Sequence, residues 1–204
     1  MLGNLKIITL PTVEPVVKAD VKEWLRVEST VTADDNLVDA MIRSARKAVE
    51  RYTRRALMTQ TWDFVMDDPL PTVPFELPLA PLQSVTGIYI TDTSDVEAAA
   101  ISTAKYLVDT DTSPNFERAG RIILKETQSW GDTSRRAYMG TRIRFVCGYG
   151  ATAASGSTAG SCPEDIVLAI KRIILASYEF RGDEEPVMPV EAKKLLAPHR
   201  ILRV

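Results

Sequence analysis

The sequence contains few of the residues that build metal sites or disulfide frameworks. It has one histidine, His199, and two cysteines, Cys147 and Cys162, which lie far apart. Zinc sites and disulfide-stabilised folds need larger sets at close spacing. The catalytic motifs G-x-S-x-G, H-E-x-x-H and C-x-x-C are also missing. Carboxylates gather only where helix caps and solvated turns explain them, so we predict no enzyme, no metal and no cofactor.

Long apolar runs and an excess of one charge are absent as well. No run of about 18 apolar residues could span a membrane, and the first ten residues lack the charged start and the cleavage site of a signal peptide. We therefore expect a protein that is made and kept in a cytoplasm. The net charge of −2 does not predict nucleic-acid binding by bulk electrostatics. The length of 204 residues fits one large domain or two small ones.

Two strong helical patterns flank the middle of the chain. The first follows Thr32, a suitable N-cap, and places apolar residues at helical spacing from Val38 to Tyr52. The second begins at Pro163 and ends at Gly182, with so few polar positions that most of its surface must be covered. Shorter helices are expected at 19–27, where Trp24 shares the apolar side, and at 190–196. Packing these helices together is the simplest way to cover their apolar faces.

The region between the two long helices has the texture of β-structure. Prolines at positions 69, 71, 74, 78 and 81 exclude helix there and limit strand pairing to short pieces. Several short strands separated by turn signals indicate a small sandwich or barrel. The expected strands are Gln60–Met66, Phe75–Leu77, Ser84–Thr91, Lys105–Asp109, Arg121–Lys125 and Thr141–Cys147.

These patterns predict an α+β fold, a split helical bundle into which a small antiparallel β-sandwich or barrel domain is inserted. Residues 1–57 form the N-terminal helical part and residues 58–150 the inserted β domain. A flexible linker follows at 151–162, since this stretch is rich in Gly, Ala, Ser and Thr. It lacks the lysine of a phosphate-binding loop. Residues 163–204 complete the helical core and end in a tail that we expect to be free from Ala197 onward.

Four basic residues fall on one stripe of the long helix: Arg43, Lys47, Arg51 and Arg54. Two interpretations stay open. The stripe is a solvated face whose charge suits the carboxyl end of the helix dipole, or it contacts an acidic partner, either a neighbouring subunit or nucleic acid. The stripe has no interleaved aromatic residues for base stacking, so we do not expect it to read a nucleotide sequence.

The run AMIRSARKAVERYTRRALMTQTWDFVMD (Ala40–Asp67) resembles the signature of tailed-phage head–tail connector proteins, also called adaptor or head-completion proteins. Arg54 stands where glycine is usual in that signature. Further motifs of the family have similar segments here, in the same order, with Cys147 replacing a small residue and His199 replacing tyrosine. These segments are Glu76–Asp92, Arg142–Gly150, Cys162–Gly182 and Leu195–Arg200. The resemblance spans residues from about 15 to 201.

The resemblance implies a structural virion protein that assembles as a ring, usually of twelve copies, below the portal of the capsid. Such a ring connects head to tail, extends the DNA channel with a wall of helices, and presents a surface to a stopper or tail protein. The expected location is the virion neck, after assembly in the host cytoplasm, with no membrane partner. DNA passes through without sequence recognition.

The resemblance also implies two sets of contact residues. The C-terminal segment, disordered when free, docks onto the portal through Leu195, Leu196, Pro198, His199, Arg200, Ile201, Leu202, Arg203 and Val204. The stripe of Arg43, Lys47, Arg51 and Arg54 contacts a neighbouring subunit or the channel.

Three alternatives remain at the level of the sequence. One is another neck component, such as a stopper or tail-terminator. A second is a nucleic-acid-binding module that uses the basic stripe and whose affinity falls steeply with salt. A third is a hydrolase, which would need a pocket that gathers carboxylates now far apart in the sequence.

Overall fold

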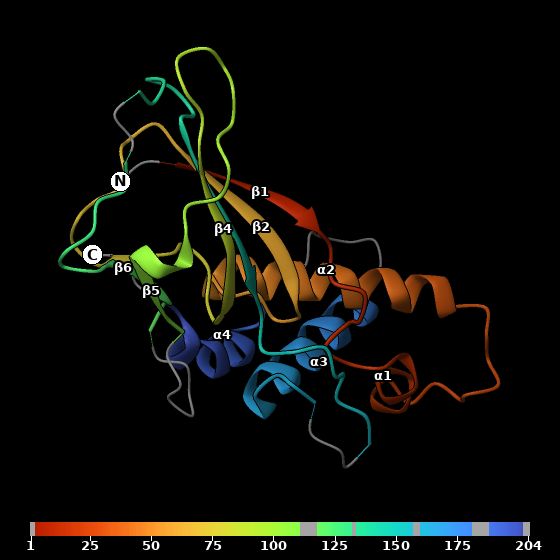
Figure 1. Cartoon of the computed structure of the whole chain (residues 1–204). Helices are drawn as coiled ribbons and strands as arrows, with labels where there is room; N and C mark the ends of the chain where they lie inside the picture. Colours follow the sequence, from red (N-terminus) through yellow and green to blue (C-terminus); the bar gives the residue numbers. More distant parts are fainter. Residues whose placement is uncertain (1–2, 111–117, 132–133, 157–159, 181–187, 202–204) are drawn as a thin grey trace. The chain divides into compact units, whose positions relative to one another are not determined.

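The computed structural model describes residues 3–110, 118–131, 134–156, 160–180 and 188–201. The chain divides into two compact units. The sheet unit consists of Met1–Leu10 and Thr59–Gly148, and the helical unit of Pro11–Met58 and Tyr149–Val204. The fold is mixed α and β with two small antiparallel sheets, in agreement with the predicted α+β class (Figure 1).

The sheet unit contains a four-stranded and a three-stranded antiparallel sheet, with strand orders β1-β2-β7-β4 and β3-β6-β5. Core positions alternate along the central strands, as the period-2 pattern predicts. Phe64 and Met66 of β2 and Ile143 and Phe145 of β7 are buried. The strands are β1 (Gly3–Thr9), β2 (Gln60–Met66), β3 (Phe75–Glu76), β4 (Leu82–Ile90), β5 (Tyr106–Asp109), β6 (Arg121–Leu124) and β7 (Thr141–Cys147), with a 3-10 turn, η1 (Thr103–Lys105), before β5.

The strand β1 is an element that the sequence prediction missed. It pairs with β2 at the edge of the four-stranded sheet, from Gly3 opposite Met66 to Thr9 opposite Thr61. Most of its residues are exposed, so apolar and polar positions do not alternate clearly and the pattern of a half-buried strand is weak. Through β1 the first ten residues belong to the sheet unit, whereas the sequence suggested an extended lead-in to the helices.

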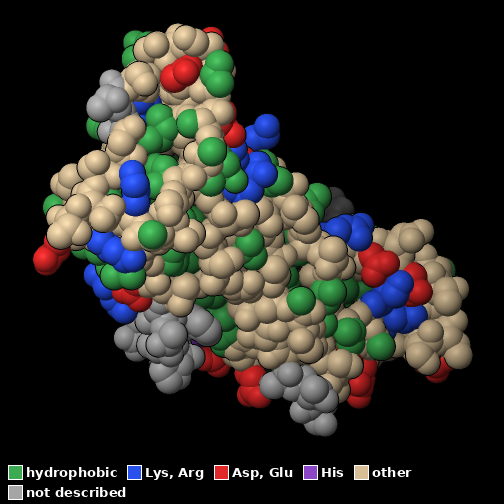
Figure 2. All heavy atoms as spheres, in the orientation of Figure 1, with side chains coloured by type: hydrophobic (Ala, Val, Ile, Leu, Met, Phe, Trp, Pro, Cys, Tyr) green, Lys and Arg blue, Asp and Glu red, His purple; other side chains and the backbone are tan. Residues whose placement is uncertain are grey.

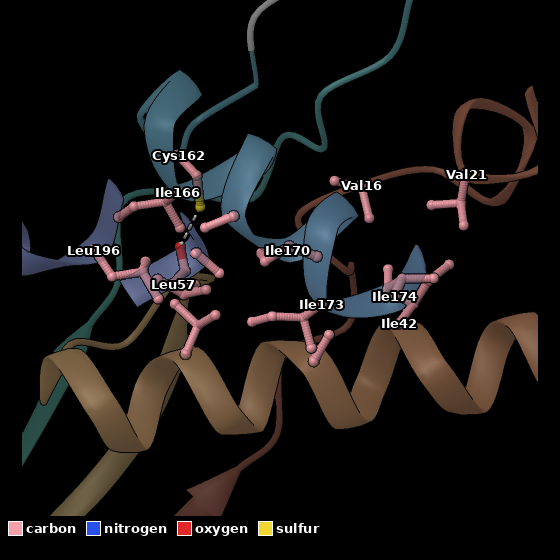
Figure 3. Close-up of a cluster of buried hydrophobic side chains, with 14 of the residues drawn as sticks. Val16, Val21, Ile42, Leu57, Cys162, Ile166, Ile170, Ile173, Ile174 and Leu196 are labelled. Carbon is pink, nitrogen blue, oxygen red and sulfur yellow. Dashed lines mark hydrogen bonds between the residues drawn. The ribbon is translucent and has the colours of Figure 1, made fainter. Parts of the chain in front are cut away.

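The helical unit is built around one apolar cluster, shown in Figure 3. Ile170, Ile173 and Ile174 of one long helix pack with Ile42 of the other, and Leu196 from the C-terminal helix closes the cluster. The helices are α1 (Lys18–Trp24), α2 (Asp35–Thr53), α3 (Glu164–Glu179) and α4 (Val190–Leu196), followed by a 3-10 turn, η2 (Ala197–His199). None of the described helices is long and apolar enough to cross a membrane.

The carboxylate of Glu50 organises the end of α2. Arg46, buried at 5% exposure, donates one hydrogen bond to Glu50 (2.9 Å) and another to Glu14 (2.7 Å). The other oxygen of Glu50 accepts the backbone N–H of Leu57 (3.1 Å). This carboxylate therefore joins the helix to the segment that follows it, while Arg46 joins the same helix to residues ahead of α1.

Arg54 ends α2 in the left-handed conformation, with φ 59° and ψ 34°, and its N–H donates to the carbonyl of Glu50. This is the turn that glycine adopts without strain. The arginine at the usual glycine position of the connector signature therefore leaves the expected turn geometry in place, at a cost of about 1–2 kcal/mol for an L-residue with a side chain.

A charge cluster on the four-stranded sheet holds Asp63 almost fully buried, at 4% exposure. Arg144 donates two hydrogen bonds to its carboxylate, at 2.8 and 2.9 Å, and Arg142 a third at 3.3 Å. Burial by itself would raise the pKa of Asp63, but the hydrogen bonds and charges of the two arginines outweigh burial and lower it. The cluster therefore joins β2 to β7 with an ionised carboxylate.

We predict that Asp63→Asn destabilises the protein by about 1–3 kcal/mol, because it leaves two arginines without their shared anion. The stability that Asp63 supplies is complete above the unfolded-state pKa of 3.8 and is lost as the pH falls through the lower folded-state pKa. Urea unfolding at pH 7 and below pH 4 measures both effects. The control is Asp95→Asn, since the side chain of Asp95 is 78% exposed. Equal losses from the two variants would contradict the proposed role of the cluster.

We also predict that Arg54→Gly stabilises the protein by up to about 1 kcal/mol. Relief of the left-handed strain exceeds the entropy that glycine adds to the unfolded chain. The matched control is Arg51→Gly, three residues earlier inside the helix, which should destabilise by about 1 kcal/mol. Thermal unfolding compares the two. Destabilisation of similar size in both variants would show that the side chain of Arg54 contributes more than its backbone costs.

Candidate functional site: two interaction surfaces

The predicted basic stripe is a continuous exposed surface on α2. Arg43, Lys47, Arg51 and Arg54 are all exposed, and a helical rise of about 1.5 Å per residue spreads them over roughly 16 Å. Among the described residues, none of the four makes an ion pair or a side-chain hydrogen bond. The stripe therefore presents four charges to whatever lies outside the helical unit.

The other cations near α2 are used within the unit. Lys18 pairs with Asp39 (3.1 Å) and Lys22 with Asp35 (2.9 Å) at the amino end of the helix. Figure 2 shows basic and acidic side chains intermingled around that end. Arg46 is buried against its carboxylates as described above. The structure thus divides the basic residues of α2 into a paired group and an unpaired stripe, a division that the sequence did not show.

The C-terminal segment is held on the end of α2, which contradicts the expectation of a free end from Ala197. Arg55 donates a hydrogen bond to the carbonyl of His199. The N–H of Ile201 donates to the carbonyl of Thr53 (3.0 Å). The guanidinium of Arg200 lies 5.3 Å from the centre of the Tyr52 ring. The segment stays in place because the residues at the helix end offer it a donor, an acceptor and an aromatic face.

The residues predicted to contact the portal occupy different environments. Leu196 is fully buried in the helical core and Leu195 packs partly against it. Pro198 and Arg200 are exposed, while His199 and Ile201 are partly buried. Leu202, Arg203 and Val204 lie outside the described residues. Of the described members, Pro198 and Arg200 are the ones that a partner reaches without opening the core.

His199 is the titratable group of this docked segment. Burial lowers its pKa, and the neighbouring charge of Arg55 lowers it further. The carboxylate of Asp165, 3.8 Å from Nε2, acts in the opposite direction without reversing the shift. The docked segment therefore favours a neutral imidazole.

A groove beside α1 contains residues that the sequence analysis did not assign to a site. It has a volume of about 840 Å³. The sequence placed Trp24 on the apolar side of the short helix, but the structure leaves this side chain 40% exposed in the groove. The apolar period fixed only that Val21 faces the core; a seven-residue helix gives too short a pattern to place its last residue. The lining residues used below are Glu23, Trp24, Lys171, Leu175 and Glu179.

The predicted catalytic and metal chemistry was absent from the sequence, and the structure brings no such group together in its described part. Among those residues no set of three or more His, Cys, Asp or Glu side chains is placed to hold a metal ion. The thiol of Cys162 is buried, donates to the carbonyl of Leu57 (3.2 Å), and has a pKa raised by burial to about 12. The features that remain for function are surfaces.

We predict that the docked segment loosens as the pH falls. Protonation of His199 is resisted in the docked state, so its stabilisation is full above the unfolded-state pKa of about 6.5 and is lost below it. The protection factor of the Ile201 amide against hydrogen exchange should fall between pH 7.5 and pH 5.5. His199→Phe should remove this dependence, and Asp165→Asn should strengthen it. Protection that is independent of pH in the wild type would contradict the prediction.

Comparison with solved structures identifies the same fold in chains of the gene transfer agent (GTA) particle. A chain from the "Neck of empty GTA particle computed with C6 symmetry" has a TM-score of 0.73 and 23% identity, covering 98% of this chain and 97% of that chain. A chain from the "Virion of native gene transfer agent (GTA) particle" has a TM-score of 0.72 and 22% identity, covering 98% and 96%. A third, from the "Neck of native GTA particle computed with C12 symmetry", has a TM-score of 0.66 and 22% identity, covering 100% and 97%.

Comparison of sequences identifies the family. No curated protein matches the chain. The family model for the phage gp6-like head-tail connector protein matches residues 19–125, which is more than half of the 204 residues. The matched region contains α2, the strands β2 to β6 and the junction between helix and sheet units in the sequence. This chain belongs to the phage gp6-like head–tail connector proteins.

Proposed function

We propose that this chain is a structural adaptor of a virion neck, which forms a ring below the portal, connects the capsid head to the tail and extends the DNA channel. The observation that carries the proposal is the match of the connector family over more than half of the chain. The likeness in fold over nearly the full length to chains of GTA necks supports it. The absence of a gathered catalytic group in the described residues is consistent with a structural role.

The proposed assembly is a ring of twelve copies that binds the portal on one side and a stopper or tail protein on the other. The solved necks were computed with C6 and C12 symmetry, which supports a cyclic arrangement of this number. Heterologous, head-to-tail contacts close into such rings when the rotation between neighbours fits. DNA passes through the channel without base recognition, and assembly takes place in the host cytoplasm.

The proposed division of labour follows the predicted domains. The helical parts from 1–57 and 163–204 form a split bundle that supplies the wall of the ring, and the strands between 58 and 150 form an inserted sandwich or barrel. The segment 151–162 links them. The first ten residues contribute to the sheet rather than to the wall, since β1 pairs with β2.

The proposed portal contact is the C-terminal segment from Leu195 to Val204, and its exposed members carry the contact. Pro198 and Arg200 project from the docked segment, whereas Leu196 anchors it in the core. The segment thus reaches the portal as an ordered turn rather than as a chain that must first be ordered, which lowers the entropic cost of binding.

We predict that the purified chain, mixed with the portal protein encoded beside it, yields a ring of twelve copies by native mass spectrometry and electron microscopy. Arg200→Glu should weaken portal binding at least about tenfold, or roughly 1.4 kcal/mol. Lys194→Glu, an exposed charge on α4, is the matched control and should bind as the wild type does.

Two outcomes would contradict the proposal. A chain that neither forms a ring nor binds the portal, alone or in virions, is not an adaptor. Cross-links to the tail tube without cross-links to the portal would assign it instead to a stopper or tail-terminator position.

A further inference from the structure

The helical unit has two charged outer faces that point in different directions. The buried residues Val38, Ile42, Ala45 and Val49 turn α2 toward α3. With about 3.6 residues per turn, the basic stripe lies on the opposite side of α2. The groove residues of α3 likewise lie opposite its buried isoleucines, which Figure 3 shows between the two helices. Both faces are therefore directed away from the shared core.

The groove face combines an exposed aromatic ring with unpaired carboxylates. Trp24 is 40% exposed, and Lys171 of the same chain lies 6.0 Å from its ring centre. Glu23 and Glu179 border the groove, are exposed, and make no ion pair within the described residues. An indole beside free carboxylates is a favourable receptor for arginine and lysine side chains, which gain both a cation–π contact and an ion pair.

The stripe face offers the complementary groups. Its cations are exposed and lack partners in the described chain, and Ala40 and Ser44 beside them leave room for close approach. Two stripes facing each other across a two-fold axis would oppose cations to cations. A head-to-tail contact, in which one face of a copy meets a different face of the next, brings opposite charges together.

We propose that the basic stripe on α2 of one copy docks into the Trp24 groove of the next copy, with Lys47 and Arg51 paired to Glu23 and Glu179. This inference rests on the ring of the proposed function and names the contact that closes it. The groove, at about 840 Å³, has room for several long side chains. The occupant is a second copy of this chain, because the charges of the two faces are complementary and both are available at once on every copy.

The test uses charge reversal on each face of the full-length chain. Lys47→Glu with Arg51→Glu reverses the stripe, and Glu23→Lys with Glu179→Lys reverses the groove. Each double variant alone should lose ring formation on the portal at least about tenfold relative to wild type. A 1:1 mixture of the two should recover it, because each reversed stripe then meets a reversed groove and each original stripe an original groove. Glu28→Lys with Lys194→Glu, exposed charges outside both faces, serves as the control.

Ring yield by electron microscopy and native mass spectrometry distinguishes the outcomes, and circular dichroism checks that each variant is folded. Recovery in the mixture, but not in either variant alone, supports the contact. Rings from wild type and from both variants would overturn it and leave the adaptor function standing. No ring from wild type on the portal would overturn the adaptor function as well. Normal rings whose reversed-stripe form loses salt-dependent affinity for a DNA duplex would assign the stripe to the channel wall instead.

Discussion

The carboxylate of Glu50 is the constraint on which the helical unit depends. One of its oxygens neutralises the buried Arg46 and the other accepts the backbone N–H of Leu57. Its own backbone carbonyl accepts the N–H that ends α2 at Arg54. A single residue thus sets the charge balance of the core, the end of the longest helix and the course of the chain toward β2. Removing a partner from such a buried set costs more than forming the set gains, because the remaining charges stay desolvated.

This internal use of charge determines what is left for partners. Arg46 and Arg55 are consumed by Glu14, Glu50 and the carbonyl of His199. Lys18 and Lys22 are consumed by aspartates at the start of α2. The basic residues that remain on α2 are therefore confined to one side of the helix. A nearly neutral chain can in this way present a strongly charged surface without a net charge that would bind nucleic acid indiscriminately.

The sequence predicted the elements better than their surroundings. The helical period fixed α2 and α3 and the alternation in Gln60–Met66 and Thr141–Cys147 fixed two central strands, because each buries one face against a core and must repeat apolar residues to do so. β1 escaped prediction because an exposed edge strand has no such repeat. The docking of residues 197–201 escaped because it depends on backbone groups of Thr53 and His199, which have no signature in the sequence. The separation of Arg46 from its exposed neighbours depends on the distant Glu14, which only folding brings close.

The burial of both cysteines has a consequence for the particle rather than for the subunit. Cys147 has no exposed surface and Cys162 only 4%, and the thiol of Cys162 is held in its protonated form. Thiolates, not thiols, react with oxidants and exchange disulfides. A neck built from this chain would pass from a reducing cell to an oxidising medium without cross-linking its neighbours. The redox change on leaving the host would then act on these cysteines only at the rate at which the folded unit opens.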